Sequence, residues 1–248
     1  MTIAELIRRA EGIVPEASET VIPSYSTTQY SKLDIFNEAA EEFAKYTLCL
    51  PKDKKFDCTA STQTYSLMAN IPDYFMPREE GFFHLRSDTT SNTTGLSWDR
   101  LKPTSVRNLD EEQPSWRTAS SSDTLLKYWI DGDIFGVHYT PSNSVTNGFH
   151  AYYFAVPSKA SALTHYPFTG TTSQDARLSL YDRTLIVYYE YRALGLLGYK
   201  NESLAKEKEF YLLCDKAKSE INTRRDLAQE SRARPKSYIS QMRGMFGR

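Results

Sequence analysis

Apolar residues recur every three or four positions in two stretches near the start of the chain, which predicts two helices there. The first helix begins at Thr2, which can form a capping box with Glu5. The second begins near Ser31 and ends before Pro51, with acidic side chains on the face opposite its apolar stripe. The apolar stripe of this second helix contains Leu33, Phe36, Ala40 and Phe43.

The same helical periodicity returns near Asp175 and predicts a second pair of helices toward the end of the chain. Gly198 suits a left-handed C-terminal cap for the first of them, and Asn201 suits the N-cap of the next. A link this short predicts that the two helices are antiparallel neighbours. One face of the last helix is predicted to carry Leu204, Tyr211, Cys214, Lys218 and Ile221.

Between the two helical regions, from about Phe56 to Phe168, the period changes and Ser, Thr, Tyr and Gly become more frequent. Asp131 and Gly132 separate two alternating runs, which is a strong hairpin signal. The segment 149–157, "FHAYYFAVP", predicts another strand, and 59–75 predicts a strand that runs into a turn. The acidic segment 109–114, "LDEEQP", is predicted to be a solvated loop.

These patterns predict an α+β protein in which a helical bundle is built from both chain ends around an inserted antiparallel β domain. An extended C-terminal tail follows the bundle. The predicted parts are 1–52 and 171–226 for the two halves of the bundle, 53–170 for the β domain and 227–248 for the tail.

Charge is distributed very unevenly along the chain. The segment 224–248 holds seven Lys or Arg and two acidic residues, whereas the rest holds 23 basic and 29 acidic residues. The tail therefore has a net charge of +5 on a body of −6. A charged block at a terminus is typical of an interaction segment.

The tail also carries an apolar stripe. Pro235 ends the preceding helix, and Ile239, Met242 and Phe246 then follow at helical spacing beside Met245. Apolar anchors among arginines favour docking in a protein groove lined with acids over a free, disordered extension. The candidate docking residues are Arg232, Arg234, Lys236, Ile239, Met242, Arg243, Met245, Phe246 and Arg248.

Nucleic-acid binding through the basic tail is the main alternative, because several cations could neutralise phosphates in a salt-dependent manner. The tail, however, contains one Phe, one Tyr and no Gly-Arg repeat. The acidic body would also repel a duplex.

The sequence contains no clear pattern of catalytic residues. The four histidines show no metal-ligand spacing, and Cys49 and Cys214 fall in or beside helical patterns that suit small buried hydrophobes. No phosphate-binding glycine motif occurs, so we predict no enzyme activity, no cofactor and no metal. A hydrolase or glycan-binding β domain remains a third hypothesis. It would use Tyr128, Trp129 and His138, although alternation puts Tyr128 and Trp129 on opposite faces.

Cysteine content and hydropathy bear on the compartment. Three cysteines without CxxC spacing do not suggest a disulfide framework. The sequence shows neither a signal peptide nor an apolar run near the ~20 residues that span a bilayer. We expect a protein made in a reducing cytoplasm, with no membrane partner.

Several stretches, in this order, resemble the head-to-tail adaptor (connector) proteins of short-tailed bacteriophages. "LDIFNEAAEEFAKYTL" resembles the second helix of that family, and "STQTYSLMANIPDYFMPREEGFFHL" resembles its strand and Leu–Pro–Asp segment. "RLKPTSVRNLDEEQPSWRTASSSDTLLKYWIDGDIFGVHYTP" resembles its paired-strand hairpin region, and "LYDRTLIVYYEYRALGLLGYKNESLAKEKEFYLLCDKAKSEI" resembles its closing helix pair. The likeness covers most of the chain but neither residues 1–30 nor the tail.

This resemblance implies a structural virion protein that forms a ring of twelve copies between the portal protein and the tail tube or nozzle proteins. Genomic DNA would pass through the ring without sequence-specific binding, and the C-terminal extension would dock on the portal. The expected location is the neck of the virion, after assembly in the host cytoplasm.

Overall fold

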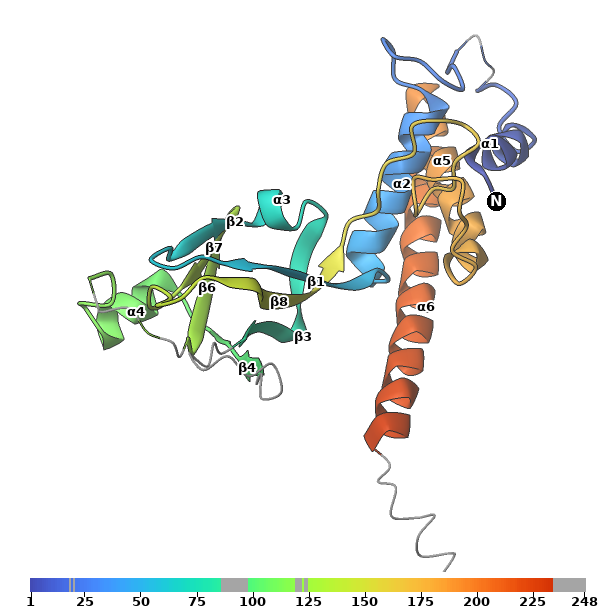
Figure 1. Cartoon of the computed structure of the whole chain (residues 1–248). Coiled ribbons are helices and arrows are strands. Elements are labelled where there is room, and N and C mark those ends of the chain that lie inside the picture. The colour runs from blue at the N-terminus through green and yellow to red at the C-terminus, as the bar shows by residue number, and fades with distance from the viewer. Residues whose placement is uncertain (18, 20, 86–97, 119–121, 123–124, 234–248) are drawn as a thin grey trace, which may run out of the picture. The chain divides into compact units, whose positions relative to one another are not determined.

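The computed structural model describes residues 1–248 except 18, 20, 86–97, 119–121, 123–124 and 234–248 (Figure 1). It is a mixed α+β structure with six α-helices and two mainly antiparallel sheets in the described part of the chain. The chain divides into two compact units. The helical unit comprises Met1–Cys49 and Lys159–Arg248, and the β unit comprises Leu50–Ser158.

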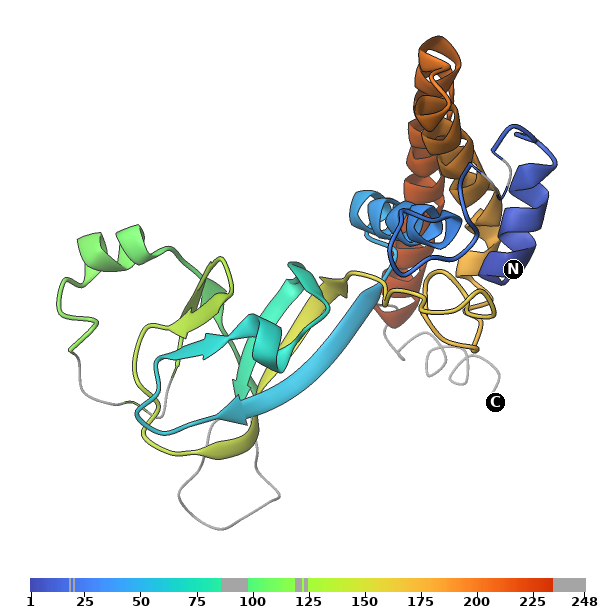
Figure 2. The same ribbon diagram turned by 90° about the horizontal axis from the view of Figure 1, so that it is seen from above.

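The helical unit contains α1, α2, α5 and α6 together with a single 3₁₀ turn, η1. Their bounds are α1 Ile3–Glu11, α2 Lys32–Thr47, η1 Leu178–Tyr181, α5 Asp182–Leu196 and α6 Lys200–Ala233. Helices α2, α5 and α6 lie side by side in both views (Figures 1 and 2), and α1 packs against α5 and α2.

Both N-terminal helices begin where predicted, the first at its predicted capping box and the second at Ser31. The Glu5 N–H donates to Thr2 Oγ1, and the Thr2 N–H donates to a Glu5 carboxylate oxygen at 2.9 Å. Ser31 and Asp34 make the same reciprocal pair at the start of α2. Helix α2 ends at Thr47, ahead of the predicted Pro51, because the next residue turns into the left-handed region with φ 55°.

Aromatic rings fill the core of the helical unit. Phe36 of α2 stacks on Tyr189 of α5 with ring centroids 5.4 Å apart, and Phe43 contacts Tyr181 at 5.1 Å. The predicted apolar stripe of α2 is buried, so packing confirms the helical period there. Beside this core Lys32 is fully buried, and its Nζ lies 2.5 Å from a carboxylate oxygen of Glu11.

The link between α5 and α6 is as short as predicted, and Gly198 adopts φ 90° just after α5. Asn201, however, is not the N-cap, because α6 already begins at Lys200. The predicted face of α6 is only partly right, because Cys214 is buried whereas Leu204 is 53% exposed. The buried stripe is Ser203, Phe210, Cys214 and Ala217.

The β unit consists of two four-stranded sheets, one in the order β1-β8-β3-β4 and the other in the order β2-β7-β6-β5. One pair, β5–β6, is parallel, which departs from the predicted all-antiparallel pattern. The strands are β1 Pro51–Cys58, β2 Thr64–Ser66, β3 Tyr74–Leu85, β4 Trp98–Arg100, β5 Lys102–Pro103, β6 Lys127–Asp131, β7 Ile134–Val137 and β8 Val145–Ala155.

Two short helices interrupt these strands. Helix α3 (Leu67–Asn70) forms the turn predicted after the first strand run. Helix α4 (Val106–Glu112) covers most of the acidic segment that we predicted as a loop. That prediction was wrong because Ser105 caps the helix at Asn108 and Leu109 is buried, so one apolar residue per turn was enough.

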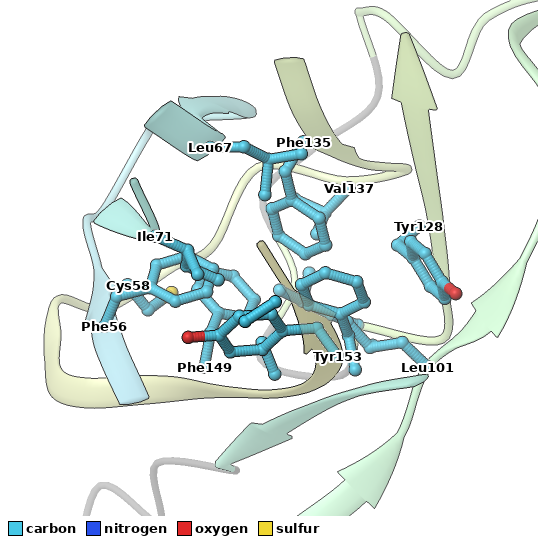
Figure 3. Packing of buried hydrophobic residues seen from close by; sticks show 14 residues of the cluster. Phe56, Cys58, Leu67, Ile71, Leu101, Tyr128, Phe135, Val137, Phe149 and Tyr153 are labelled. Carbon is cyan, nitrogen blue, oxygen red and sulfur yellow. The ribbon is translucent and has the colours of Figure 1, made fainter. Parts of the chain in front are cut away.

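The two sheets pack through a core of aromatic rings (Figure 3). Phe135 of β7 is fully buried, and its ring lies 4.6 Å from Phe82 and 5.3 Å from Phe149 of the other sheet. The predicted hairpin is confirmed, with Gly132 at φ 57° between β6 and β7. Tyr128 enters this core, whereas Trp129 packs on the opposite side of β6 with Leu109 and Trp116.

Candidate partner-binding surfaces

The predicted docking residues lie at and beyond the end of the last helix. Arg232 belongs to the final turn of α6, because the helix continues to Ala233. The other candidates (Arg234, Lys236, Ile239, Met242, Arg243, Met245, Phe246 and Arg248) lie outside the described residues. The position of α6 is therefore what the structure contributes to this candidate site.

Polar contacts with α2 and the residue that follows it hold α6 between Asp215 and Arg225. Tyr46 donates from its hydroxyl to Asp215 at 2.6 Å, and Lys218 Nζ lies 5.1 Å from the centre of the Tyr46 ring. Further along, the Arg225 guanidinium donates to the Leu48 carbonyl. Eight residues of α6 follow Arg225, a length of about 12 Å. The helical unit thus fixes the helix from which the basic segment continues.

A cysteine and a histidine do meet in the structure, in the β unit. Cys58 Sγ lies 3.9 Å from His84 Nε2, and both side chains are buried. The sequence did not reveal this pair, because 26 residues separate its members. Burial raises the pKa of the Cys58 thiol to about 11, so the thiol stays protonated near neutral pH. A buried thiol in that state is a weak nucleophile, and the pair is better explained as a contact within the core.

The cysteines that the sequence analysis singled out are in the helical unit. Cys214 is fully buried in α6, and burial raises the pKa of its thiol to about 12. Cys49 lies just beyond α2, is half-buried, and has its thiol pKa raised to about 11 by the same cause. Cys214 therefore matches the prediction of a small buried hydrophobe, and Cys49 does so in part.

The three residues of the glycan-binding hypothesis do not form an accessible platform. Tyr128 and Trp129 are buried on opposite sides of β6, as alternation predicted. His138 is also buried, next to the end of β7, and its Nδ1 accepts a hydrogen bond from the Lys127 N–H at 3.3 Å. Burial lowers the pKa of His138 below its usual value. No flat aromatic face is left on these residues for a sugar to stack on.

Hollows in the described surface are small. One between α1 and α5 has a volume of about 220 Å³ and is lined by Arg9, Ile13, Arg183, Ile186 and Glu190 together with Met1. Sites for drug-sized ligands have volumes of roughly 300–1,000 Å³. The carboxylate of Glu190 is already paired with Lys206 at 2.7 Å. This hollow is therefore smaller than a typical small-molecule site.

Some apolar side chains lie outside the described cores in each unit. On the α5–α6 pair, Leu196 and Tyr199 lie at the turn and Leu212 is 69% exposed. On the β unit, several half-buried aromatic residues lie on the face of the β1-β8-β3-β4 sheet opposite the core of Figure 3. These are Phe83, Trp98, His150 and Tyr152.

The part of the chain that the structure describes contains no group of three or more His, Cys, Asp or Glu residues placed to hold a metal ion. Within the same residues, no helix combines the length and the apolar composition that crossing a membrane requires. No protein-family model matches the chain, and no curated protein is significantly similar to it.

Proposed function

We propose that this chain is a structural virion protein, a head-to-tail adaptor that forms a ring between the portal and the tail of a short-tailed bacteriophage. In this proposal the helical unit is the family's bundle, and the β unit is its inserted domain. The basic C-terminal segment is the anchor on the portal. The protein has no catalytic role.

The observation that carries the proposal is the grouping of elements from both chain ends. Helices α1 and α2 share a compact unit with α5 and α6, although Leu50–Ser158 separates the two pairs in the sequence. Core contacts such as the stacked rings of Phe36 and Tyr189 join the two pairs. This is the order of elements on which the resemblance to the adaptor family rests.

The anchor role is supported by the charge of the tail and by the way α6 is held. Contacts up to Arg225 fix α6 on the helical unit, and the helix then continues to Ala233. A segment that continues from a fixed helix loses less freedom on docking than one joined by a long loop. Ile239, Met242, Met245 and Phe246 would fill apolar pockets of the portal, and the arginines around them would pair with its acids.

The acidic body suits the wall of a DNA channel. Outside the segment 224–248 acids outnumber bases by six, so the body carries no net positive charge to replace the counterions of a passing duplex. DNA would then slide along the ring without being retained. Neighbouring copies, tail tube or nozzle proteins and the portal would be the lasting partners.

The test uses the full chain, a truncation after Ala233 that keeps all of α6, and portal rings encoded in the same genome. A second variant replaces Ile239, Met242, Met245 and Phe246 with Ser and keeps every charge. Sedimentation or native mass spectrometry should show the full chain on portal rings, and both variants should bind at least tenfold more weakly. Equal binding by the truncated chain would refute the anchor.

Binding to random-sequence duplex DNA serves as the comparison. If the full chain ignores portal rings but binds DNA with a steep salt dependence that truncation abolishes, the tail binds nucleic acid instead. The Ser variant distinguishes portal docking from nucleic-acid binding. It keeps every charge, so it should bind DNA as the full chain does if the tail is a nucleic-acid-binding segment.

A further inference from the structure

A fully buried lysine lies at the end of the strap, the segment 12–30 between α1 and α2 apart from its undescribed residues 18 and 20. Lys32 is the first residue of α2, and its side chain is 0% exposed. Its Nζ lies 2.5 Å from a carboxylate oxygen of Glu11, the last residue of α1, and 3.4 Å from one of Glu19 in the strap. Charged side chains are almost never buried this completely unless they are paired. Two carboxylates therefore compensate the charge of this ammonium.

Glu19 also organises the part of the strap that closes over the start of α2. Ser24 donates its N–H to the Glu19 carboxylate at 2.8 Å and its hydroxyl to the same group at 2.5 Å. The carbonyls of Pro23 and Ser24 accept the N–H groups of Lys32 and Leu33 at 2.8 and 3.1 Å. These amides belong to the first turn of α2, where a helix offers no acceptor of its own. The strap thus caps the helix to which the buried ammonium belongs.

The two carboxylates differ from Lys32 in their access to water. The Glu11 side chain is 38% exposed, and that of Glu19 is 61% exposed. Protons from the solvent can therefore reach both carboxylates, whereas the ammonium has no access to water while the strap is closed. Once both carboxylates are neutral, the closed strap encloses a positive charge without a counter-charge. An ion left unpaired in a protein interior is strongly destabilising, so opening becomes favourable.

The neighbouring ionisable groups behave differently in acid. Burial, together with the negative charges of Glu11 and Glu19, raises the pKa of the Tyr189 phenol of α5, so this group stays neutral. Asp34, on α2 itself, is engaged by the N–H and the hydroxyl of Ser31. Hydrogen bonds from the Ser24 hydroxyl and N–H lower the pKa of Glu19. The stabilisation from such a carboxyl is complete above its unfolded pKa of about 4.3 and is lost as the pH falls through the lower folded value.

We infer that the strap is an acid-sensitive device, closed while Glu11 and Glu19 are charged and open when both are neutral, because Lys32 cannot remain buried alone. Opening would release the Lys32 and Leu33 amides and uncover Ile22, a strap residue that is now 3% exposed. The inference concerns the helical unit alone and does not depend on the proposed function.

Amide hydrogen exchange of the full chain measures the opening at residues 32 and 33 themselves. Replacing Glu11 and Glu19 together by Gln should lower the protection of these two amides roughly tenfold or more at neutral pH, because the ammonium stays buried without a counter-charge. Adding Lys32→Met, which removes the charge and keeps a long side chain, should restore the protection. Glu41→Gln is the matched control, since it breaks an exposed ion pair of the same helix and should leave these amides unchanged.

The second measurement is a pH titration of the wild-type chain. Protection of residues 32 and 33, corrected for the intrinsic exchange rate, should fall between neutral pH and about pH 3.5 while the α5 amides stay protected, and Lys32→Met should remove this response. Asp34 is unchanged in that variant, so a response that survives Lys32→Met would overturn the inference. Amides that open only together with α5, or a double Gln variant with wild-type protection, would overturn it as well. The titration needs no substitution, so it decides the question even if a variant fails to fold.

Discussion

Phe135→Ala should destabilise the β unit and leave the helical unit intact. The Phe135 side chain is fully buried among other rings. The centroids of the Phe82, Phe149 and Phe56 rings lie 4.6, 5.3 and 5.7 Å away. Removing a buried phenylalanine ring costs about 3–5 kcal/mol of unfolding free energy, because the lost burial and the remaining cavity add. Phe135→Leu should cost less, about 1–2 kcal/mol.

The three tryptophans make the effect measurable in one unit. Trp98, Trp116 and Trp129 all belong to the β unit, whereas its helices α3 and α4 are short. Tryptophan fluorescence therefore follows the β unit, and circular dichroism at helical wavelengths follows mainly the helical unit. With a urea dependence of about 2 kcal/mol per molar, Phe135→Ala should lower the fluorescence midpoint by roughly 1.5–2.5 M.

The helical signal should keep its wild-type midpoint if the two compact units unfold independently. If both signals shift together by the same amount, the units unfold as one cooperative body. If the fluorescence midpoint of Phe135→Ala falls by less than the shift expected for Phe135→Leu, Phe135 is not the centre of the core.

Three further predictions follow from single residues. Ser31→Ala should cost about 1 kcal/mol of stability, seen by circular dichroism, because it removes the cap from the Asp34 N–H, and Ser31→Asn should recover most of it. Burial lowers the folded-state pKa of His138, so the unfolded state binds more protons, and the fluorescence midpoint should fall as pH drops below about 6.5. A His138→Gln variant with the same pH dependence would contradict that assignment. Cys58 and Cys214 should react with a thiol reagent far more slowly in the folded than in the unfolded protein, since burial protects them and raises their pKa, and rapid labelling of either would show that its unit opens readily.

Local signals in the sequence were enough for the elements whose geometry depends on neighbouring residues. The capping box at Thr2, the helix start at Ser31, the left-handed Gly198 and the turn at Asp131–Gly132 all occur where they were predicted. Each depends on a few consecutive residues and their backbone angles, so the chain encodes it locally. The opposite placement of Tyr128 and Trp129 follows in the same way from the period of a strand.

Signals that depend on distant partners were misjudged. Leu204 was placed on the buried face of α6, but α5 and α2 cover Phe210 and Cys214 instead, and only packing decides between stripes one position apart. The helix α4 was missed because its single buried residue, Leu109, gains its contacts from Trp116 and Trp129.

The residues alone indicated the helices of the helical unit, the change from helical to alternating period and the separation of charge between body and tail. The tertiary structure decided which faces are buried and which residues meet. It brings Cys58 to His84, buries Lys32 beside Glu11, and gathers Trp98, His150 and Tyr152 on one sheet face. The physical reason is that propensity and capping act over a few residues, whereas burial and pairing depend on surfaces supplied by segments far away in the chain.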